Sequence, residues 1–364
     1  MDSQLLSLLT DAHIALGRLD GGVRVIPDPD FFVAMYVRRE AVLSSQIEGT
    51  QSSLQDLLEV ELDPGRAFGS DVGDIVNYVA AMNYGMSRLG ELPLSLRLIR
   101  EIHAQLLRDG RGAHATPGEF RTTQNWIGPE GAPLSRATFV PPPRDAMRTA
   151  LSDFEQFLHR RDRGALLVDI GLAHAQFETI HPFVDGNGRV GRLLITFLLV
   201  YGQVLQRPVL YLSYYFKRNR SEYYDRLMAI RLRGDWEGWL RFFLRGVAET
   251  ATEAAATAGR IFEMREQHRT LAMSTSGANG LRLLAAMFHR PLLNVNYVAA
   301  QLEVTFPTAN RLVGAFVDQG LLREVTGQRR SRLFRYEPYL RLFDEPASMI
   351  DAETRPIDTT ESGT

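Results

Sequence analysis

Apolar side chains recur every three or four residues along most of this chain, a spacing that places them on one face of a helix. The pattern begins at residues 4–19, where Leu5 and Leu16 share a side and Gly21-Gly22 is expected to end the helix. Equivalent periods predict further helices over residues 30–48, 71–89, 95–107, 145–159, 166–180, 193–201 and 235–266. The fold is therefore predicted to be mostly α.

Residues 116–143 interrupt this helical pattern. Prolines and glycines punctuate the segment, and three consecutive prolines close it at 141–143. Residues 120–127 and 137–140 flank the central turn residues, so we expect an extended β-hairpin arm. An exposed strand edge can hold another peptide segment by strand addition. The alternative is a surface loop with Trp126 packed beneath it.

The C-terminal part has a different organisation. Residues 271–280 contain the run Ser-Thr-Ser-Gly-Ala-Asn, which is typical of a linker. Three helical periods and then two extended stretches follow, at residues 281–288, 294–302, 305–319, 321–325 and 333–336. A helix-turn-helix followed by a basic hairpin indicates an α+β winged-helix domain over residues 281–345. Residues 346–364 are expected to form a disordered acidic tail.

Length, composition and net charge narrow the class of protein. A length of 364 residues suggests two domains, and 45% hydrophobic residues with a net charge of −2 are ordinary values that name no partner. The absence of cysteine excludes disulfides and thiolate metal sites. The first ten residues lack the basic segment of a signal peptide, and the longest apolar run, at 193–200, is too short to span a bilayer. A cytoplasmic protein without a membrane partner is therefore expected.

The stretch with the most chemistry is His-Pro-Phe-Val-Asp-Gly-Asn-Gly-Arg-Val-Gly-Arg, residues 181–192. The start of a helix offers unpaired N–H groups and a positive dipole to phosphate, and glycines let the backbone approach it closely. The aspartate can hold a divalent cation, the arginines can bind phosphate oxygens, and the histidine can accept a proton. The alternative is a Gly/Asn turn that leads into a core helix after a chance histidine.

This stretch is similar at every fixed position to the active-site motif of the Fic/Doc superfamily, His-Pro-Phe-x-[Asp/Glu]-Gly-Asn-Gly-Arg-x-x-Arg. The resemblance extends over roughly residues 1–266 and implies a helical Fic-type catalytic core at 111–270 with a β-hairpin flap. It also implies that AMP is transferred from ATP to a hydroxyl side chain of a protein target, with Mg²⁺ or Mn²⁺ as the metal. A P-loop motif is absent from the sequence, which argues against a P-loop kinase.

The resemblance also implies a role for each motif residue. His181 would be the catalytic base and Asp185 the metal ligand. Gly186, Asn187 and Gly188 would receive the α-phosphate charge, and Arg189 and Arg192 would bind the β- and γ-phosphates. Doc-type relatives that phosphorylate their targets replace the glycine at the position of Gly188, so its presence here favours AMP transfer.

A second pattern lies in the N-terminal helical region, residues 1–110. Residues 44–49, Ser-Ser-Gln-Ile-Glu-Gly, resemble the Fic inhibitory motif [Ser/Thr]-x-x-x-Glu-[Gly/Asn] through Ser44, Glu48 and Gly49. The resemblance implies that Glu48 pairs with Arg192 and keeps this arginine from the γ-phosphate. The alternative is a helix-terminal glutamate in water. Some relatives instead remove AMP from targets with this glutamate, and the sequence does not decide between the two roles.

Further site residues follow from the resemblance. The flap would bind the target through Gln124, Asn125, Trp126, Ile127 and Gly128, and the pair Tyr223-Tyr224 would lie beside the adenine. For the aromatic residues after 213 in general, the alternative is packing between helices. The oligomeric state is open, and a homodimer is one candidate.

A different class of function is a DNA-binding regulator that uses the winged helix, with the nucleotide site as a sensor. Residues 281–343 carry nine arginines against four acidic residues, so this part is basic although the whole chain is not. Many winged helices bind proteins instead, so both partners remain hypotheses.

Overall fold

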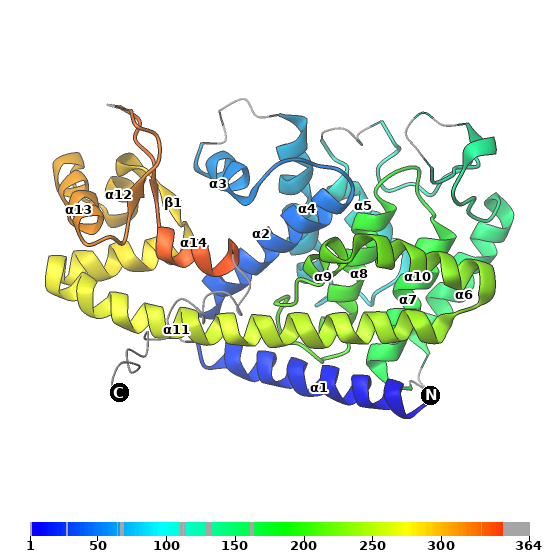
Figure 1. Cartoon of the computed structure of the whole chain (residues 1–364). Helices are drawn as coiled ribbons and strands as arrows, with labels where there is room; N and C mark the ends of the chain where they lie inside the picture. The colour runs from blue at the N-terminus through cyan, green and yellow to red at the C-terminus, as the bar shows by residue number, and fades with distance from the viewer. Residues whose placement is uncertain are drawn as a thin grey trace, which may run out of the picture. The chain divides into compact units, whose positions relative to one another are not determined.

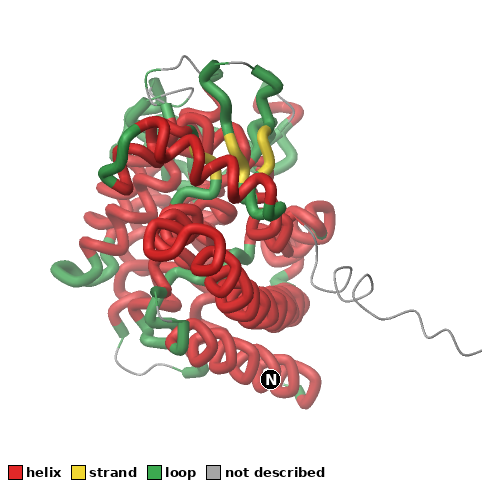
Figure 2. The backbone as a smooth tube through the Cα atoms, turned by 90° about the vertical axis from the view of Figure 1, so that its left-hand side faces the viewer, coloured by secondary structure: helices red, strands yellow, loops and turns green. Residues whose placement is uncertain are grey.

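The computed structural model describes residues 2–26, 28–63, 65, 69–109, 112, 114–128, 131, 133–160, 164–328 and 330–344. This part of the chain is mostly helical, as the hydrophobic pattern predicted, with one small antiparallel sheet (Figure 2). Its internal contacts divide it into two units, Met1–Arg24 with Phe32–Thr252 and Val25–Phe31 with Glu253–Thr364. The predicted tail at 346–364 lies outside the described residues. Across the described ranges, no helix has the length and apolar content needed to cross a membrane.

The helices of the first unit enclose a hydrophobic core (Figure 1). They are α1 (Ser3–Arg24), α2 (Pro29–Ile47), α3 (Leu54–Leu62), α4 (Ser70–Arg88), α5 (Leu96–Leu106), α6 (Arg144–His159), α7 (Leu166–Ile180), α8 (Asn187–Tyr201), α9 (Ser213–Arg218), α10 (Arg220–Arg233) and the start of α11 (Trp236–His289). Helix α8 contacts α4, α5 and α7, and nearly all of its side chains are buried. A helix in this position holds its first turn rigidly.

One local prediction for the first unit was wrong, and two features of this unit were not predicted. Helix α1 continues through Gly21-Gly22 because Val23 is buried, and that burial outweighs the poor helix propensity of glycine. Helix α3 was not predicted, although Ser53 and Asp56 form a capping box at its start. The stretch 213–232 forms two helices, and the break between them lies at Asn219.

The flap is much less regular than the extended hairpin that the sequence predicted. In its described residues the only strand-type pairing is a single antiparallel bridge, Ile127↔Phe139, and a short 3-10 helix, η1 (Leu134–Arg136), lies between its two limbs. The prolines explain the difference, because each one removes a backbone N–H that a ladder would need.

The second unit contains a three-stranded antiparallel sheet in the order β1-β3-β2. Its elements after α11 are β1 (Leu292–Leu293), α12 (Val295–Leu302), α13 (Phe306–Asp318), β2 (Arg323–Glu324), β3 (Phe334–Arg335) and α14 (Glu337–Asp344). Helices α12 and α13 pack on each other, and Asn294 caps α12. The sequence predicted these two helices and the β2–β3 pair, but neither β1 nor α14. The winged-helix assignment stays a prediction.

Most of the segment predicted as a linker is helical. Only Ser276 and Gly277 leave helical geometry, and Gly277 has a φ of 57°. At this kink α11 turns back on itself, as Figure 1 shows in yellow. Gly280 then packs so closely on Ala272 that an added Cβ would lie 2.1 Å from the Ala272 carbonyl oxygen. The two segments of α11 therefore form a tight helical hairpin within the second unit.

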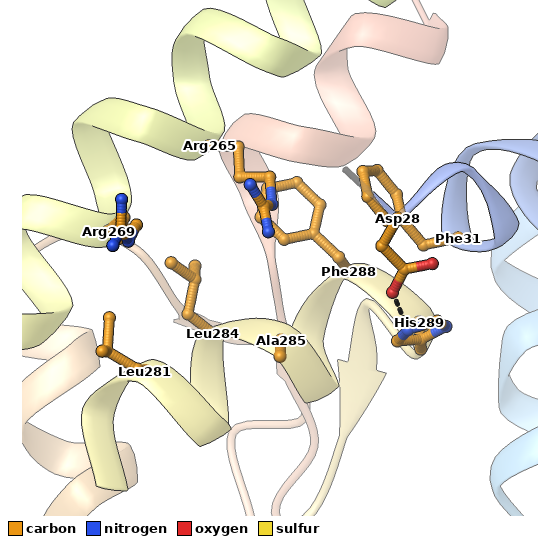
Figure 3. Close-up of a pocket in the computed structure, with 9 residues that line it drawn as sticks. All are labelled: Asp28, Phe31, Arg265, Arg269, Leu281, Leu284, Ala285, Phe288 and His289. Carbon is orange, nitrogen blue, oxygen red and sulfur yellow. Dashed lines mark hydrogen bonds and ion pairs between the residues drawn. The ribbon is translucent and has the colours of Figure 1, made fainter. Parts of the chain in front are cut away.

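A pocket of about 130 Å³ lies between these two segments of α11 in the second unit (Figure 3). Arginines of the first segment and apolar side chains of the second line it, together with the chain just before and at the start of α2: Asp28, Phe31, Arg265, Arg269, Leu281, Leu284, Ala285, Phe288 and His289. Two of these lining residues are in contact, because Asp28 Oδ2 lies 3.0 Å from His289 Nε2.

Candidate active site

The predicted motif lies at the junction of α7 and α8, in the centre of the first unit. Helix α7 ends at Ile180, and His181 follows in the left-handed region with a φ of 50°, a conformation that costs energy for any residue with a side chain. Gly186 precedes α8 with a φ of 78°, which glycine adopts freely. The motif therefore passes from one helix to the next through a six-residue turn, residues 181–186.

Two buried polar side chains fix this turn. Asn187 accepts a hydrogen bond from the Phe183 backbone N–H at 2.8 Å and donates one to the Phe183 carbonyl at 2.9 Å. His103 of α5 stacks on the Phe183 ring and donates from Nε2 to the Asp185 carbonyl at 3.0 Å. Its Nδ1 accepts from the Gly118 N–H at 2.8 Å, so the ring is neutral, and burial lowers its pKa to about 4. The side chain of Asn187, predicted to bind phosphate, is thus already occupied with the turn.

Arg192 and Glu48 are in direct contact although 144 residues separate them. Arg192 Nη2 lies 2.7 Å from Glu48 Oε1, and the guanidinium also donates to the hydroxyl and the carbonyl of Ser44, at 2.8 and 3.0 Å. Arg192 is 2% exposed. A buried cation is costly without such partners. Gly49 lies two residues after the end of α2 and has a φ of 96°, a conformation that favours glycine.

The Glu48 carboxylate lies directly over the start of α8. A Cβ added to Gly188 would be 2.2 Å from Glu48 Oε1, so the acid occupies space that only a glycine leaves open. The first amides of α8 lack helical acceptors, because the first bond within the helix runs from Val190 N–H to the Gly186 carbonyl. A carboxylate near a helix N-terminus is electrostatically favourable, and a phosphate would be favoured by the same field.

Asp185 and Arg189 form the other side of the site. Arg189 Nη2 is 3.4 Å from Asp185 Oδ2, and Arg189 is buried while the Asp185 side chain is 52% exposed. An exposed carboxylate oxygen is the donor that Mg²⁺ prefers, and Mg²⁺ commonly takes one protein carboxylate plus phosphate and water oxygens. Within the described ranges no group of three or more acidic or histidine side chains surrounds a common point. The residues present therefore fit a metal held jointly with a phosphate ligand.

The His181 imidazole is uncharged near neutral pH. Burial, with the positive charge of Arg231 as the next cause, lowers the pKa of His181 to about 4, and the Glu48 carboxylate acts in the opposite direction. At pH 7 the imidazole is therefore unprotonated and can accept a proton.

Most of the predicted flap residues make contacts within the protein, whereas Trp126 has an exposed side chain. Gln124 donates to the carbonyls of Asn125 and Pro141, and Asn125 donates to the Phe183 carbonyl at 2.9 Å. Ile127 forms the bridge to Phe139. A Cβ added to Gly128 would lie 3.4 Å from the Cα of Ala137 on the opposite limb, and Trp126 is 41% exposed. Target binding by these five residues stays a prediction.

The two tyrosines predicted to lie beside adenine have different environments. Tyr223 is 1% exposed and stacks on Phe216 at a ring distance of 4.5 Å, and its hydroxyl bonds to His174. Tyr224 is 39% exposed. The structure thus places Tyr223 in an aromatic core and Tyr224 at the surface, and the role of both in nucleotide binding stays a prediction.

Four further residues support the site, and the sequence did not identify them as site residues. Buried Glu40 of α2 accepts hydrogen bonds from Ser213 and Tyr78, which anchors the helix that precedes Glu48; burial raises the pKa of Glu40 to about 7. His103, Arg121 and Arg231 contact the backbone of the motif or of α7. The sequence signal for Arg121 was the Gly-x-Phe-Arg run at the start of the flap, and the other three left no local signal.

Comparisons with known proteins agree with this geometry. The profile described as Fic/DOC family N-terminal matches residues 6–87, and the profile described as Fic/DOC family matches residues 93–199. A protein named protein adenylyltransferase Fic from Drosophila grimshawi is 30% identical over 212 residues, which cover 56% of this chain and 39% of that protein. The protein of the same name from Drosophila melanogaster is 28% identical over 248 residues, 66% of this chain and 44% of its own length. The chain thus spans less than half the length of these curated relatives.

Solved structures show the same fold at low sequence identity. A Fic family protein from Desulfovibrio desulfuricans superposes with a TM-score of 0.60 at 18% identity, over 92% of this chain and 96% of that one. A Fic-domain-containing signaling protein from Bacteroides thetaiotaomicron gives a TM-score of 0.55 at 15% identity, over 69% of this chain and 97% of that one. The two family profiles together cover more than half of the chain, and the active-site turn lies inside the second profile. The chain therefore belongs to the Fic/DOC family.

Proposed function

We propose that this protein transfers AMP from ATP to a hydroxyl side chain of a protein target and that Glu48 inhibits the transfer. The observation that carries the proposal is the contact between Glu48 and Arg192 over Gly188, at a helix N-terminus beside a neutral histidine. The names of the curated relatives support the reaction class, and ATP is the substrate that this class requires.

The reaction forms a bond between the target oxygen and the α-phosphorus and breaks the bond between that phosphorus and the bridging oxygen to the β-phosphate. His181 takes the proton of the attacking hydroxyl, and pyrophosphate leaves with the electron pair of the broken bond. A base held next to the attacking oxygen contributes roughly a hundredfold to ten-thousandfold in rate. The left-handed conformation of His181 holds its backbone at the entrance to the turn.

The start of α8 would bind the triphosphate. The amides of Gly186 and Gly188 and the helix dipole favour the α-phosphate charge, and Arg189 and Arg192 would orient the β- and γ-phosphates for in-line attack. Asp185 would hold Mg²⁺ or Mn²⁺. When bound, such a cation neutralises charge on the phosphate oxygens.

Inhibition follows from competition for one arginine. Arg192 already binds Glu48 and Ser44, so it is unavailable to a γ-phosphate in this arrangement. The Glu48 carboxylate also repels a phosphate that approaches Gly188. A displaced triphosphate would leave the α-phosphorus badly oriented for attack.

The direct test uses α-labelled and γ-labelled ATP with purified Glu48→Gly protein and a lysate of the source organism. Label from the α position is expected on protein, and label from the γ position is not. The signal should require Mg²⁺ or Mn²⁺ and disappear in the further variant Asp185→Ala, because Asp185 is the only carboxylate of the motif. Transfer of the γ-label instead would identify a kinase, and release of AMP from modified protein would favour the removal reaction.

The rate should depend on pH with an unusually low inflection. Because burial lowers the pKa of His181 to about 4, the base stays neutral until the pH falls well below its ordinary value of 6.5. Transfer by Glu48→Gly protein should therefore be constant from pH 8 to about 5 and fall below that. Removing Glu48 shifts the pKa further down, since this carboxylate raises it. A pH-rate profile with circular dichroism as the folding control checks this, and an inflection near 6.5 would contradict it.

A second candidate function is binding of duplex DNA by the second unit. Asn310 and Arg311 are exposed on α13, and Arg330 and Arg332 are exposed in the loop between β2 and β3. A helix with such side chains beside a basic loop suits the major groove and the adjacent phosphates. A gel shift of the full chain at 0.1 M salt tests the idea. Arg311→Ala with Arg332→Ala should abolish a shift that Arg282→Ala leaves intact, and no shift at all would remove this candidate.

A further inference from the structure

The flap needs a source of rigidity other than strand pairing. In its described residues, backbone pairing between the limbs is confined to the bridge between Ile127 and Phe139. One such bridge cannot hold two proline-rich limbs in register, because isolated strand pairs are marginal in water even with a full ladder. Gln124 adds one side-chain bond between the limbs, to the Pro141 carbonyl, and a buried arginine supplies three further bonds that also reach the active-site turn.

Arg121 lies at the base of the flap and is 2% exposed. Its Nη1 donates to the Thr123 carbonyl on the first limb at 3.2 Å, and its Nη2 donates to the Pro142 carbonyl on the second limb at 2.6 Å. Its Nε donates to the His181 carbonyl at 3.0 Å. The Arg121 backbone N–H also binds the Pro182 carbonyl, at 2.9 Å. One side chain thus joins both limbs to the turn that carries the proposed base.

The partners of Arg121 are unusual for a buried cation. All three are backbone carbonyls, and in the described part of the chain no carboxylate pairs with the guanidinium. Burial alone lowers the Arg121 pKa. Burying an apolar side chain costs less free energy than burying an unpaired charge. A buried arginine without a counter-ion therefore indicates that this position needs the several N–H donors of a guanidinium.

A second arginine reaches the same region from α10. Arg231 Nη2 donates to the Glu178 carbonyl in the last turn of α7 at 2.9 Å. Its guanidinium lies 3.8 Å from the centre of the Phe139 ring, on the second limb of the flap. Arg231 therefore connects the flap to the end of the helix that leads into His181.

We propose that Arg121, assisted by Arg231, is the positioning residue that sets the distance of the flap from His181 and the register of its two limbs. A target segment added to the flap edge then presents its hydroxyl at a fixed distance from the base. This inference rests on the proposed AMP transfer for its catalytic consequence, but the mechanical part stands apart from it. Lysine keeps the charge of arginine and cannot make three divergent bonds in one plane.

Hydrogen exchange tests the mechanical part without any assay of activity. In Arg121→Lys protein, the amides of Ile127, Thr138 and Phe139 should exchange about tenfold faster or more than in the parent, because the limbs lose the guanidinium bonds that join them to each other and to the turn. Amides inside α8 should not change. The control is Arg100→Lys, since Arg100 also donates to a flap carbonyl, that of Gly118, but with a side chain that is 42% exposed and, among the described flap residues, contacts only the first limb. Equal flap exchange in Arg121→Lys and Arg100→Lys would overturn the proposal.

The catalytic part is tested in the Glu48→Gly background with α-labelled ATP. Adding Arg121→Lys should lower transfer to protein about ten- to a hundredfold, while the Kd for ATP stays within about twofold. Equal losses of transfer and ATP affinity would mean general damage to the site and would overturn the positioning role. If Glu48→Gly protein transfers no AMP, the proposed function fails, and the exchange result still decides whether Arg121 holds the flap.

The unmodified protein gives a test that needs no variant to fold. If Arg121 joins the limbs, the amides of Arg121, Ile127 and Phe139 should open together and show the same opening free energy by hydrogen exchange. If the Ile127 and Phe139 amides exchange about a hundredfold faster than the Arg121 amide, the flap opens while its base stays closed. That result would overturn the proposal.

Discussion

Protein carrying Glu48→Gly is expected to transfer AMP roughly a hundredfold faster or more than the parent protein, because the α-phosphorus becomes aligned for attack. The substitution removes the carboxylate that lies 2.7 Å from Arg192 and over Gly188. Arg192 then becomes available to the γ-phosphate. Transfer from α-labelled ATP, including self-modification, measures the change.

Two further variants separate this mechanism from a general loosening of the site. Glu48→Gly combined with Arg192→Ala should lose most of the gain, since the released arginine is absent. Glu48→Gln keeps the shape of the side chain without its charge, so its rate should fall between those of the parent and of Glu48→Gly. The fold should persist in Glu48→Gly, because Arg192 keeps both bonds to Ser44. Unchanged or lower transfer in folded Glu48→Gly protein would exclude inhibition by this residue.

The second large effect is expected for His181→Ala in the Glu48→Gly background. Transfer should fall by roughly a hundredfold to ten-thousandfold, the contribution of a general base, while the Kd for ATP changes little. In the proposed mechanism the imidazole takes a proton from the target hydroxyl and holds no phosphate, so binding and chemistry should separate. Calorimetric titration with ATP and a single-turnover transfer assay measure the two quantities.

Controls for this variant concern the strained turn. Alanine at position 181 must also adopt a φ of 50°, so a loss of stability is expected alongside the loss of activity. His181→Asn keeps a side chain that tolerates this conformation and still removes the base. Both variants should therefore lose transfer equally. Loss of ATP affinity in proportion to the loss of rate would show that His181 binds the nucleotide.

Much of the fold was predictable because helices follow local periodicity. The ranges expected for α4, α5, α6 and α7 agree with the structure to within a few residues. At the motif, the expected loop that leads into a buried helix is also observed. Such elements bury one continuous face, and the spacing of apolar residues records that face. Short elements escaped prediction for the same reason. Strand β1 has two residues and α14 has eight, so each offers little periodicity. Helix α12 is as short but could be predicted together with α13, as a helix-turn-helix.

The sequence by itself determined the family, the helical class and the identity of the motif residues, since these are properties of contiguous stretches. Only the tertiary structure decided which of them meet. It brought Glu48 against Arg192, buried Tyr223 and left Tyr224 at the surface, and used the Asn187 side chain to close the turn. It also replaced a strand ladder in the flap by the side chain of Arg121. Contacts between segments far apart in sequence depend on packing and on the burial of charge, and neither leaves a local pattern.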